Sequence, residues 1–346
     1  MKALIVAPAW IGDTVMAQPL FRRLHQYTPG LQLDALAPPW VVPVLERMPE
    51  ISRIVASPFA HGELALAARY RLARTLAQGG YRRAYVLPNS LKSALIPCLA
   101  GIPERIGFTG EARYALLNRR HALDTSRLPQ MAERFAQLAE RSGAALPLPL
   151  PSPRLSSTPA QQTATLAALQ LACAQRIAVF CPGAEYGPAK RWPERHFAAL
   201  ADELSERGYA VWLLGSSKDK AVGEGIVRLA GAGAVVNLCG STTLCQAMDL
   251  IAAASVVVCN DSGLMHVAAA LERPLVAVYG SSSPTFTPPL SARAQIISLG
   301  LECSPCFART CPPGHFDCLN QLEPARVLAA CLRAGVGEVP AIGVAQ

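Results

Sequence analysis

The sequence lacks a long apolar segment, and it is poor in charge. Of its 346 residues, 16% are charged and 51% are hydrophobic, and the mean hydropathy is +0.25. No uninterrupted apolar run approaches the ~20 residues that a membrane-spanning helix needs. The apolar start Met1–Pro8 is too short for a secretory signal and continues into a Gly-Asp turn. We therefore expect a first β-strand there and a cytoplasmic protein.

The signatures of several ligand classes are also absent. No G-x-G-x-x-G follows an expected strand, which argues against a dinucleotide-dependent dehydrogenase, and the G-K-[ST] ending of a P-loop is missing. Helix-turn-helix, zinc-finger and RNP patterns are missing too, and the arginines are not interleaved with aromatic residues. We therefore expect no nucleic-acid partner.

Positive charge is present, but only in the first half of the chain. Residues 1–150 hold 18 Lys and Arg against 10 Asp and Glu, whereas residues 151–346 hold 14 of each, so the net charge of +8 lies in the first half. A solvated surface is the ordinary explanation. The alternative is an anionic partner for this half, such as an acidic lipid surface.

Strand-like and helix-like segments alternate along both halves, which predicts parallel sheets wound with helices. The alternating prolines of Leu146–Pro153 favour an extended connector between two domains, residues 1–150 and 151–346. The expected strands are 3–7, 32–37, 53–56, 85–87, 105–108, 176–181, 210–214, 235–238, 255–259, 274–279 and 295–298. The expected helices are 13–26, 40–48, 64–78, 93–99, 130–142, 193–207, 220–229, 244–254 and 321–334.

The most informative loop is Asn260–His266, which lies between a short apolar run and an Ala-rich helical segment. Such a junction presents free backbone N–H groups and a positive helix end at the carboxyl edge of a sheet. Asp261, Ser262 and His266 add an acid, a hydroxyl and an imidazole. The loop suits a phosphorylated, hydroxyl-rich ligand, although Asp or Ser before a helix is also an ordinary N-cap.

Three further loops follow expected strands. In Pro182–Pro193 the adjacent cations Lys190 and Arg191 indicate phosphate contacts or, more simply, a solvated pair. In the loop after the first strand, Asp13 either caps the following helix or acts as a general base. The loop Gly215–Asp219 suits a ribose or a base.

Together, Gly12-Asp13, Leu87–Ser93, Pro182–Pro193, Gly215–Asp219 and Asn260–His266 resemble the ADP-heptose:lipopolysaccharide heptosyltransferases of glycosyltransferase family 9. The resemblance runs from residue 1 to about residue 290 and is strongest to the heptosyltransferase II branch. It implies the α/β GT-B fold, in which two Rossmann-like domains face each other across a cleft. The acceptor would bind residues 1–150 and the nucleotide sugar residues 151–346.

The reaction that the resemblance implies is an inverting transfer of L-glycero-D-manno-heptose from ADP-L-glycero-β-D-manno-heptose to the first heptose of the Kdo-lipid A inner core. No cofactor is required. A heptosyltransferase I or III acting on another inner-core acceptor, or a GT-B sugar-nucleotide epimerase, are the alternatives. An anionic lipid acceptor would explain the basic first half, with the protein bound peripherally to the cytoplasmic face of the inner membrane.

The resemblance also implies roles for individual residues. Asp13 matches the position of the family's base, and Lys190 that of the lysine which neutralises the departing ADP. The acceptor candidates are Gly12, Asn89, Ser90 and Lys92. The donor candidates are Glu185, Tyr186, Ser217, Lys218, Thr242, Asp261, Ser262, Gly263 and His266.

The 11 cysteines of the chain fall into two groups. Seven lie in apolar or helical contexts and are expected to be reduced core residues: Cys98, Cys173, Cys181, Cys239, Cys245, Cys259 and Cys331. The other four form a C-x2-C-x4-C-x6-C pattern within residues 303–318: Cys303, Cys306, Cys311 and Cys318. These four could bind zinc or an iron–sulfur cluster, form disulfides outside the cytosol, or remain free thiols. A metal-sensing module is the non-enzymatic alternative.

Overall fold

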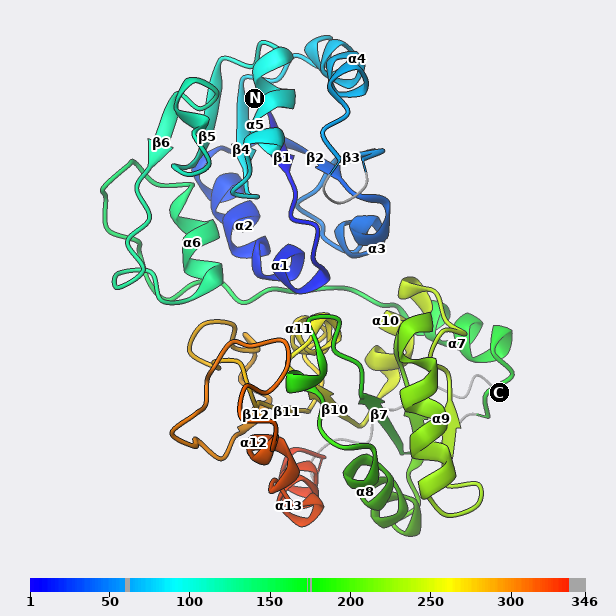
Figure 1. Cartoon of the computed structure of the whole chain (residues 1–346). Helices are drawn as coiled ribbons and strands as arrows, with labels where there is room; N and C mark the ends of the chain where they lie inside the picture. The colour runs from blue at the N-terminus through cyan, green and yellow to red at the C-terminus, as the bar shows by residue number, and fades with distance from the viewer. Residues whose placement is uncertain (60–62, 173, 175, 336–346) are drawn as a thin grey trace. The chain divides into compact units, whose positions relative to one another are not determined.

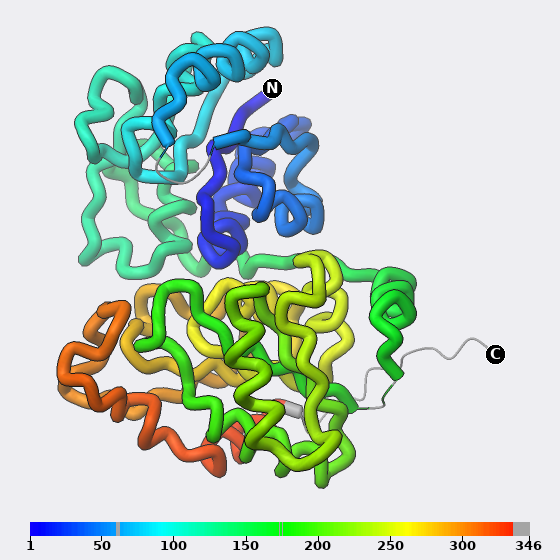
Figure 2. The backbone as a smooth tube through the Cα atoms, turned by 45° about the vertical axis from the view of Figure 1, so that its right-hand side comes forward, coloured from blue at the N-terminus to red at the C-terminus, as the bar shows by residue number. Residues whose placement is uncertain are grey.

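The computed structural model describes residues 1–59, 63–172, 174 and 176–335. The chain forms two compact units, Met1–Pro153 and Arg154–Gln346. The division falls within the Pro-rich segment, through which the chain passes from the first unit into the second (Figure 2). No helix in the described ranges is both long enough and apolar enough to cross a bilayer.

The first unit is built on a six-stranded parallel sheet of order β3-β2-β1-β4-β5-β6 (Figure 1). Its strands are β1 Lys2–Val6, β2 Gln32–Ala37, β3 Arg53–Ala56, β4 Arg83–Val86, β5 Glu104–Phe108 and β6 Arg119–His121. Its helices are α1 Ile11–Met16, α2 Gln18–Tyr27, α3 Val42–Leu45, α4 Leu66–Ala77, α5 Leu91–Leu99 and α6 Met131–Gln137, with 3-10 turns η1 Pro39–Val41 and η2 Arg113–Ala115. The helices α4 and α5 pack together over one face of β1 and β4.

The second unit repeats this order in its own six-stranded parallel sheet, β12-β11-β10-β7-β8-β9. Its strands are β7 Ile177–Cys181, β8 Ala210–Leu213, β9 Val235–Asn237, β10 Val256–Asn260, β11 Leu275–Val278 and β12 Ala294–Ile297. Its helices are α7 Pro159–Ala168, α8 Glu194–Glu206, α9 Lys220–Leu229, α10 Leu244–Ala253, α11 Gly263–Ala270, α12 Asp317–Asn320 and α13 Pro324–Gly335, with turns η3 Pro188–Lys190 and η4 Ser217–Asp219. One face is covered by α8, α9 and α13, and α7 packs on α10.

The central strands form because they are apolar on both sides. All five residues of β7 and of β10 are buried, as expected for parallel strands that helices cover on both faces. In both units the strand order reverses direction beside the central strand, between β1 and β4 in one and between β7 and β10 in the other. Ligands of open α/β sheets bind at such a switch point, at the carboxyl ends of the strands.

Some sequence predictions of the elements were wrong. The single helix expected over 13–26 is two helices, α1 and α2, which meet at Ala17 just before Pro19, because proline has no N–H to continue the first helix. The helix expected over 321–334 is α13, which begins three residues later, at Pro324, and the short α12 before it was not predicted. The strand β6 and the helix α7 were not predicted.

Candidate functional site

The loops after β7 and β10 lie side by side at the switch point of the second unit. The two strands pair directly, with Cys181 opposite Cys259. Asn260, the last residue of β10, is completely buried and fixes both ends of the neighbouring loop. Its Nδ2 donates to the Pro182 carbonyl at 2.7 Å, and its Oδ1 accepts from the Trp192 amide at 3.0 Å. The loop that carries Lys190 is therefore held by the strand that leads into Asp261.

Lys190 and Asp261 form the central charge pair of this edge. The Lys190 Nζ lies 2.6 Å from Asp261 Oδ2, and the two side chains are 18% and 5% exposed. A lysine that is shielded from solvent and held by a carboxylate is pre-positioned for a second anion nearby.

His266, in α11, is buried and close enough to this pair to interact with both of its charges. Burial lowers the pKa of His266 to about 4, the Asp261 carboxylate opposes that shift, and the Lys190 ammonium adds to it. The imidazole is therefore neutral near pH 7. It can donate or accept a hydrogen bond but brings no charge of its own.

The N-terminus of α11 lies next to the Lys190–Asp261 pair. Ser262 is the N-cap residue in extended conformation, its side chain makes no capping bond, and Gly263 begins the helix. Both residues are partly exposed. The first-turn amides and the positive helix end thus lie beside Lys190, an arrangement that binds anions such as phosphate.

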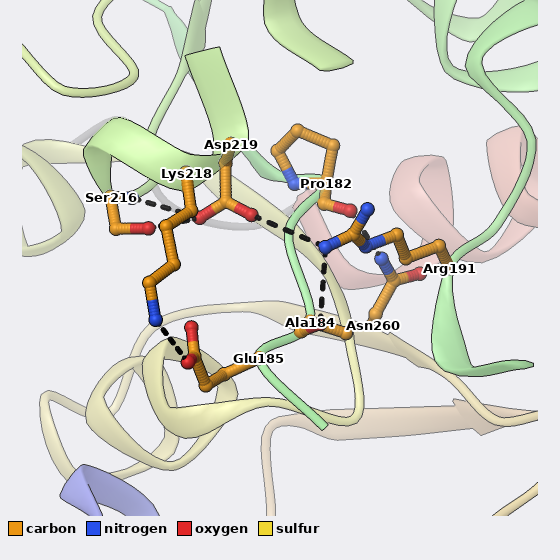
Figure 3. Close-up of polar contacts among 8 residues, drawn as sticks. All are labelled: Pro182, Ala184, Glu185, Arg191, Ser216, Lys218, Asp219 and Asn260. Atoms are coloured by element: carbon orange, nitrogen blue, oxygen red, sulfur yellow. Dashed lines mark hydrogen bonds and ion pairs between the residues drawn. The ribbon is translucent and has the colours of Figure 1, made fainter. Parts of the chain in front are cut away.

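The loop after β8 packs against the loop after β7 (Figure 3). Asp219 Oδ2 accepts from the Ser216 amide at 2.9 Å and from its hydroxyl at 2.8 Å. Arg191 Nη2 lies 4.0 Å from Asp219 Oδ1 and 3.4 Å from the Ala184 carbonyl, to which it donates. Figure 3 also shows Lys218, whose Nζ lies 2.5 Å from Glu185 Oε1. This exposed pair joins two donor candidates to each other.

Ser217 and Thr242 come from adjacent loops. The Gly240 amide donates to the Gly215 carbonyl at 3.0 Å, so the loops after β8 and β9 touch. Ser217 is exposed, and Thr242 is partly exposed just before Thr243, the N-cap of α10. All nine donor candidates thus lie at the carboxyl edge of one sheet, seven in its loops and turns and two, Gly263 and His266, in the first half of α11.

Tyr186 links the Lys190 loop to the Cys-rich segment. Its hydroxyl donates to the Phe307 carbonyl at 2.6 Å. The Lys190 Nζ and the Arg309 guanidinium carbon each lie 5.1 Å from the centre of the Tyr186 ring.

The first unit places the remaining candidates at its own switch point. Gly12 and Asp13 lie in the first turn of α1, directly after β1, with Gly12 buried and Asp13 partly exposed. The N-cap of α1 is Trp10, so the interpretation of Asp13 as the helix cap was wrong. The helix begins two residues earlier than predicted.

Asn89, Ser90 and Lys92 follow β4, which pairs with β1. Ser90 is the N-cap of α5, and Lys92 is partly exposed in its first turn. The buried Arg113 donates to Asn89 Oδ1 and to the Pro88 carbonyl. The amide of Leu91 donates to Glu111 Oε2 at 2.8 Å. This loop is therefore held in place by residues from the segment after β5.

Comparison with known proteins identifies the family. The profile of glycosyltransferase family 9 (heptosyltransferase) matches residues 69–316. The chain belongs to glycosyltransferase family 9. It is 45% identical over 336 residues to lipopolysaccharide heptosyltransferase 2 of Escherichia coli K12, covering 95% of this chain and 97% of that protein. It is 46% identical over 309 residues to lipooligosaccharide heptosyltransferase 2 of Haemophilus influenzae, covering 86% and 89%.

Solved structures agree with this assignment. The structure of the E. coli ADP-heptose lipopolysaccharide heptosyltransferase II matches with a TM-score of 0.89 and 43% identity, covering 97% of this chain and 99% of that one. The E. coli heptosyltransferase WaaC with ADP matches with a TM-score of 0.71 at 22% identity, covering 96% and 100%, and shows the fold alone. This glycosyltransferase has the predicted GT-B fold of two parallel-sheet α/β domains.

The cysteines of this glycosyltransferase do not support a metal centre. Cys303 and Cys306 are exposed, and Cys311 and Cys318 are partly exposed, all as free thiols. Over the described ranges, no three His, Cys, Asp or Glu side chains are grouped so that they could hold a metal ion. Of the seven expected core cysteines, Cys181, Cys239, Cys259 and Cys331 are buried, Cys98 and Cys245 are partly buried, and Cys173 lies outside the described residues.

Several residues that shape the site were not predicted to do so. Asn260 and Asp219 were noted only as members of their loops, and Arg309 was not singled out. Arg191 was expected to contact phosphate or solvent, and it lies against Asp219 and the Ala184 carbonyl. An asparagine at the last position of a buried strand is the one local signal that was available, because a buried amide requires partners.

Proposed function

We propose that this chain is an inverting heptosyltransferase that moves L-glycero-D-manno-heptose from ADP-heptose to the first heptose of the Kdo-lipid A inner core. The observation that carries the proposal is the Lys190–Asp261 pair at the N-terminus of α11, beside the neutral His266. The relatives named heptosyltransferase 2, at 45–46% identity, support the choice of donor and acceptor.

The second unit would bind the donor. Lys190 and the amides of Ser262 and Gly263 would hold the diphosphate and neutralise the charge that develops as ADP departs. Asp261 would orient donor hydroxyls and keep Lys190 in place. His266, being neutral, would contribute a hydrogen bond. The loops of Glu185–Tyr186, Ser217–Lys218 and Thr242 would contact the nucleoside side of the ligand.

The first unit would bind the acceptor and remove its proton. Asp13 would accept the proton of the acceptor hydroxyl as its oxygen attacks the anomeric carbon of the donor. The bond from that carbon to the phosphate oxygen breaks, ADP leaves with the electron pair, and the configuration inverts. Gly12, Asn89, Ser90 and Lys92 would contact the acceptor, whose anionic groups suit the ammonium of Lys92.

The protein would meet its lipid acceptor as a peripheral protein on the cytoplasmic face of the inner membrane. The helix α4 contains no acidic residue, and its exposed side chains include Arg71, Arg74, Leu66 and Tyr70. Cationic side chains beside exposed apolar ones favour an anionic lipid surface. Such binding should weaken as salt screens the charges.

The test is the release of ADP from ADP-heptose with three acceptors, which are Kdo-lipid A and the same lipid carrying one or two heptoses. The proposal predicts release with the one-heptose acceptor alone. Release with bare Kdo-lipid A, or with the two-heptose form, would reassign the step to a heptosyltransferase I or III. No release with any acceptor would contradict heptosyl transfer.

A further inference from the structure

The Cys-rich segment lies against the donor loops and is held there by main-chain hydrogen bonds. The Ala189 amide donates to the Arg309 carbonyl at 3.1 Å, and the Phe307 amide donates to the Ser281 carbonyl at 2.7 Å. Ser304 Oγ donates to the Gly280 carbonyl at 2.5 Å. Residues 304–309 are thus fastened both to the turn that carries Lys190 and to the loop after β11.

Gly187 is required for this approach. A Cβ atom at Gly187 would overlap the carbonyl oxygen of Arg309. The hydroxyl of Tyr186 meets the Phe307 carbonyl from the same turn. The segment therefore fits closely onto residues 186–189, the residues that lead directly into Lys190.

The contact brings a second cation to the Lys190 turn. Arg309 and Lys190 lie at the same distance from one aromatic ring, that of Tyr186. Lys190 is partly shielded and paired with Asp261, whereas Arg309 is exposed and forms no ion pair with any carboxylate of the described ranges. An exposed guanidinium that is oriented by an aromatic face keeps its hydrogen-bond donors available for a phosphate.

We infer that Arg309 binds the diphosphate of the nucleotide sugar, and that residues 304–309 hold the Lys190 turn in position for the same group. This inference rests on the proposed donor site and adds a residue to it. It gives the Cys-rich segment a role that depends on its backbone and on Arg309 and requires no metal. The ligand is recognised as two linked phosphates, one near Lys190 and α11 and the other within reach of Arg309.

The experiment is titration of the full-length protein with ADP and, separately, with adenosine. Arg309→Gln removes the charge but keeps the backbone carbonyl that binds Ala189. We expect the Kd for ADP to rise about tenfold at low salt, as for loss of a hydrogen bond to a charged group. The Kd for adenosine should not change, and Arg309→Lys should restore part of the affinity for ADP.

The matched control is Arg228→Gln, another exposed arginine of the second unit, near the end of α9. Its ADP affinity should equal that of the unmodified protein, and the melting temperature of all the arginine variants should be unchanged. Gly187→Ala, which displaces the segment while retaining Arg309, should also weaken ADP binding. Unchanged ADP affinity in Arg309→Gln at low salt would overturn the inference about Arg309 and leave the proposed donor site standing. Failure of the unmodified protein to bind ADP would overturn the proposed donor site as well.

Discussion

The two units share one strand order but differ in what their carboxyl edges carry. The edge of the second unit has a shielded ion pair, a neutral buried imidazole and an open helix N-terminus. The edge of the first unit has a partly exposed carboxylate, Asp13, and a loop held by Arg113. The same scaffold therefore carries a paired lysine beside a helix N-terminus in one unit and a partly exposed carboxylate in the other, because the loops and not the sheet decide what each edge presents.

The two units also differ in net charge. The first 150 residues have a net charge of +8, and the rest of the chain is balanced. In the second unit Lys190 is partly shielded and paired with Asp261, whereas Arg71 and Arg74 on α4 of the first unit are exposed. Concentrated charge binds a small anion tightly, and a spread charge attracts an extended anionic surface.

The largest expected effect separates chemistry from donor binding. Asp13→Asn should lower the rate of heptosyl transfer about 10²- to 10⁴-fold, the usual contribution of a general base, and leave the Kd for ADP unchanged. Transfer is measured as ADP release, and binding by calorimetry. Asp124→Asn, at an exposed acid of the same unit, is the control and should behave as the unmodified protein. A normal rate of transfer by Asp13→Asn would contradict the assignment of Asp13 as the base.

The next effect concerns the anion site of the second unit. Lys190→Met should weaken ADP binding about 10- to 100-fold, because a charged contact to the diphosphate is lost. It should also lower the free energy of unfolding by about 3 kcal/mol, because the Asp261 carboxylate is left buried without its partner. Calorimetry and urea unfolding measure the two quantities.

The control for Lys190→Met is the exposed pair Arg207–Glu203 at the C-terminal end of α8, with an N–O distance of 2.6 Å. Arg207→Met should cost about 0.5 kcal/mol or less, because solvent screens an exposed i,i+4 pair. Equal losses of stability in both variants would show that burial does not distinguish the two pairs.

The sheets could be predicted from the sequence because their strands are buried runs such as Val256–Cys259, whose apolar character marks them without any tertiary information. The sequence could also predict that Lys190, Asp261 and His266 lie in one site, because their loops follow neighbouring strands. The edge strand β6 was missed because Arg119-Arg120-His121 has no apolar pattern. The contact of Arg309 with Tyr186 was missed because it joins residues far apart in sequence and depends on how loops pack.

The buried imidazole of His266 in the second unit should make the free energy of unfolding depend on pH. The pKa of His266 is about 4 in the folded protein, against an ordinary 6.5. The unfolded chain therefore binds the extra proton between these values, so the stability that the neutral imidazole provides is complete above pH 6.5 and is lost as pH falls towards 4. We expect a loss of about 2 kcal/mol between pH 7 and pH 5.

This loss is measured by urea unfolding at the two pH values. His266→Gln should remove that part of the pH dependence. His121 of the first unit, whose pKa is also lowered by burial, should leave a smaller residual slope in the same direction. A pH dependence unchanged in His266→Gln would contradict the assignment of a neutral buried imidazole.

The smallest expected effect concerns the surface of the first unit. Arg71→Gln should weaken co-sedimentation with vesicles of anionic phospholipid by about fivefold at low salt, corresponding to about 1 kcal/mol for one charge. The difference should shrink in 0.5 M salt, a concentration at which the Debye length falls to about 4 Å. Arg228→Gln in the second unit is the control, and equal losses in both variants would exclude a lipid-facing role specific to α4.

The most direct test of the assignment of donor binding to the second unit is hydrogen–deuterium exchange with and without ADP. Bound ligand slows the exchange of the amides whose opening it opposes. The account predicts ADP-dependent protection in peptides that cover residues 182–193, 215–219 and 260–266, and none in peptides that cover residues 8–16 and 87–95. Protection in the first-unit peptides, with none at residues 182–193 and 260–266, would contradict it.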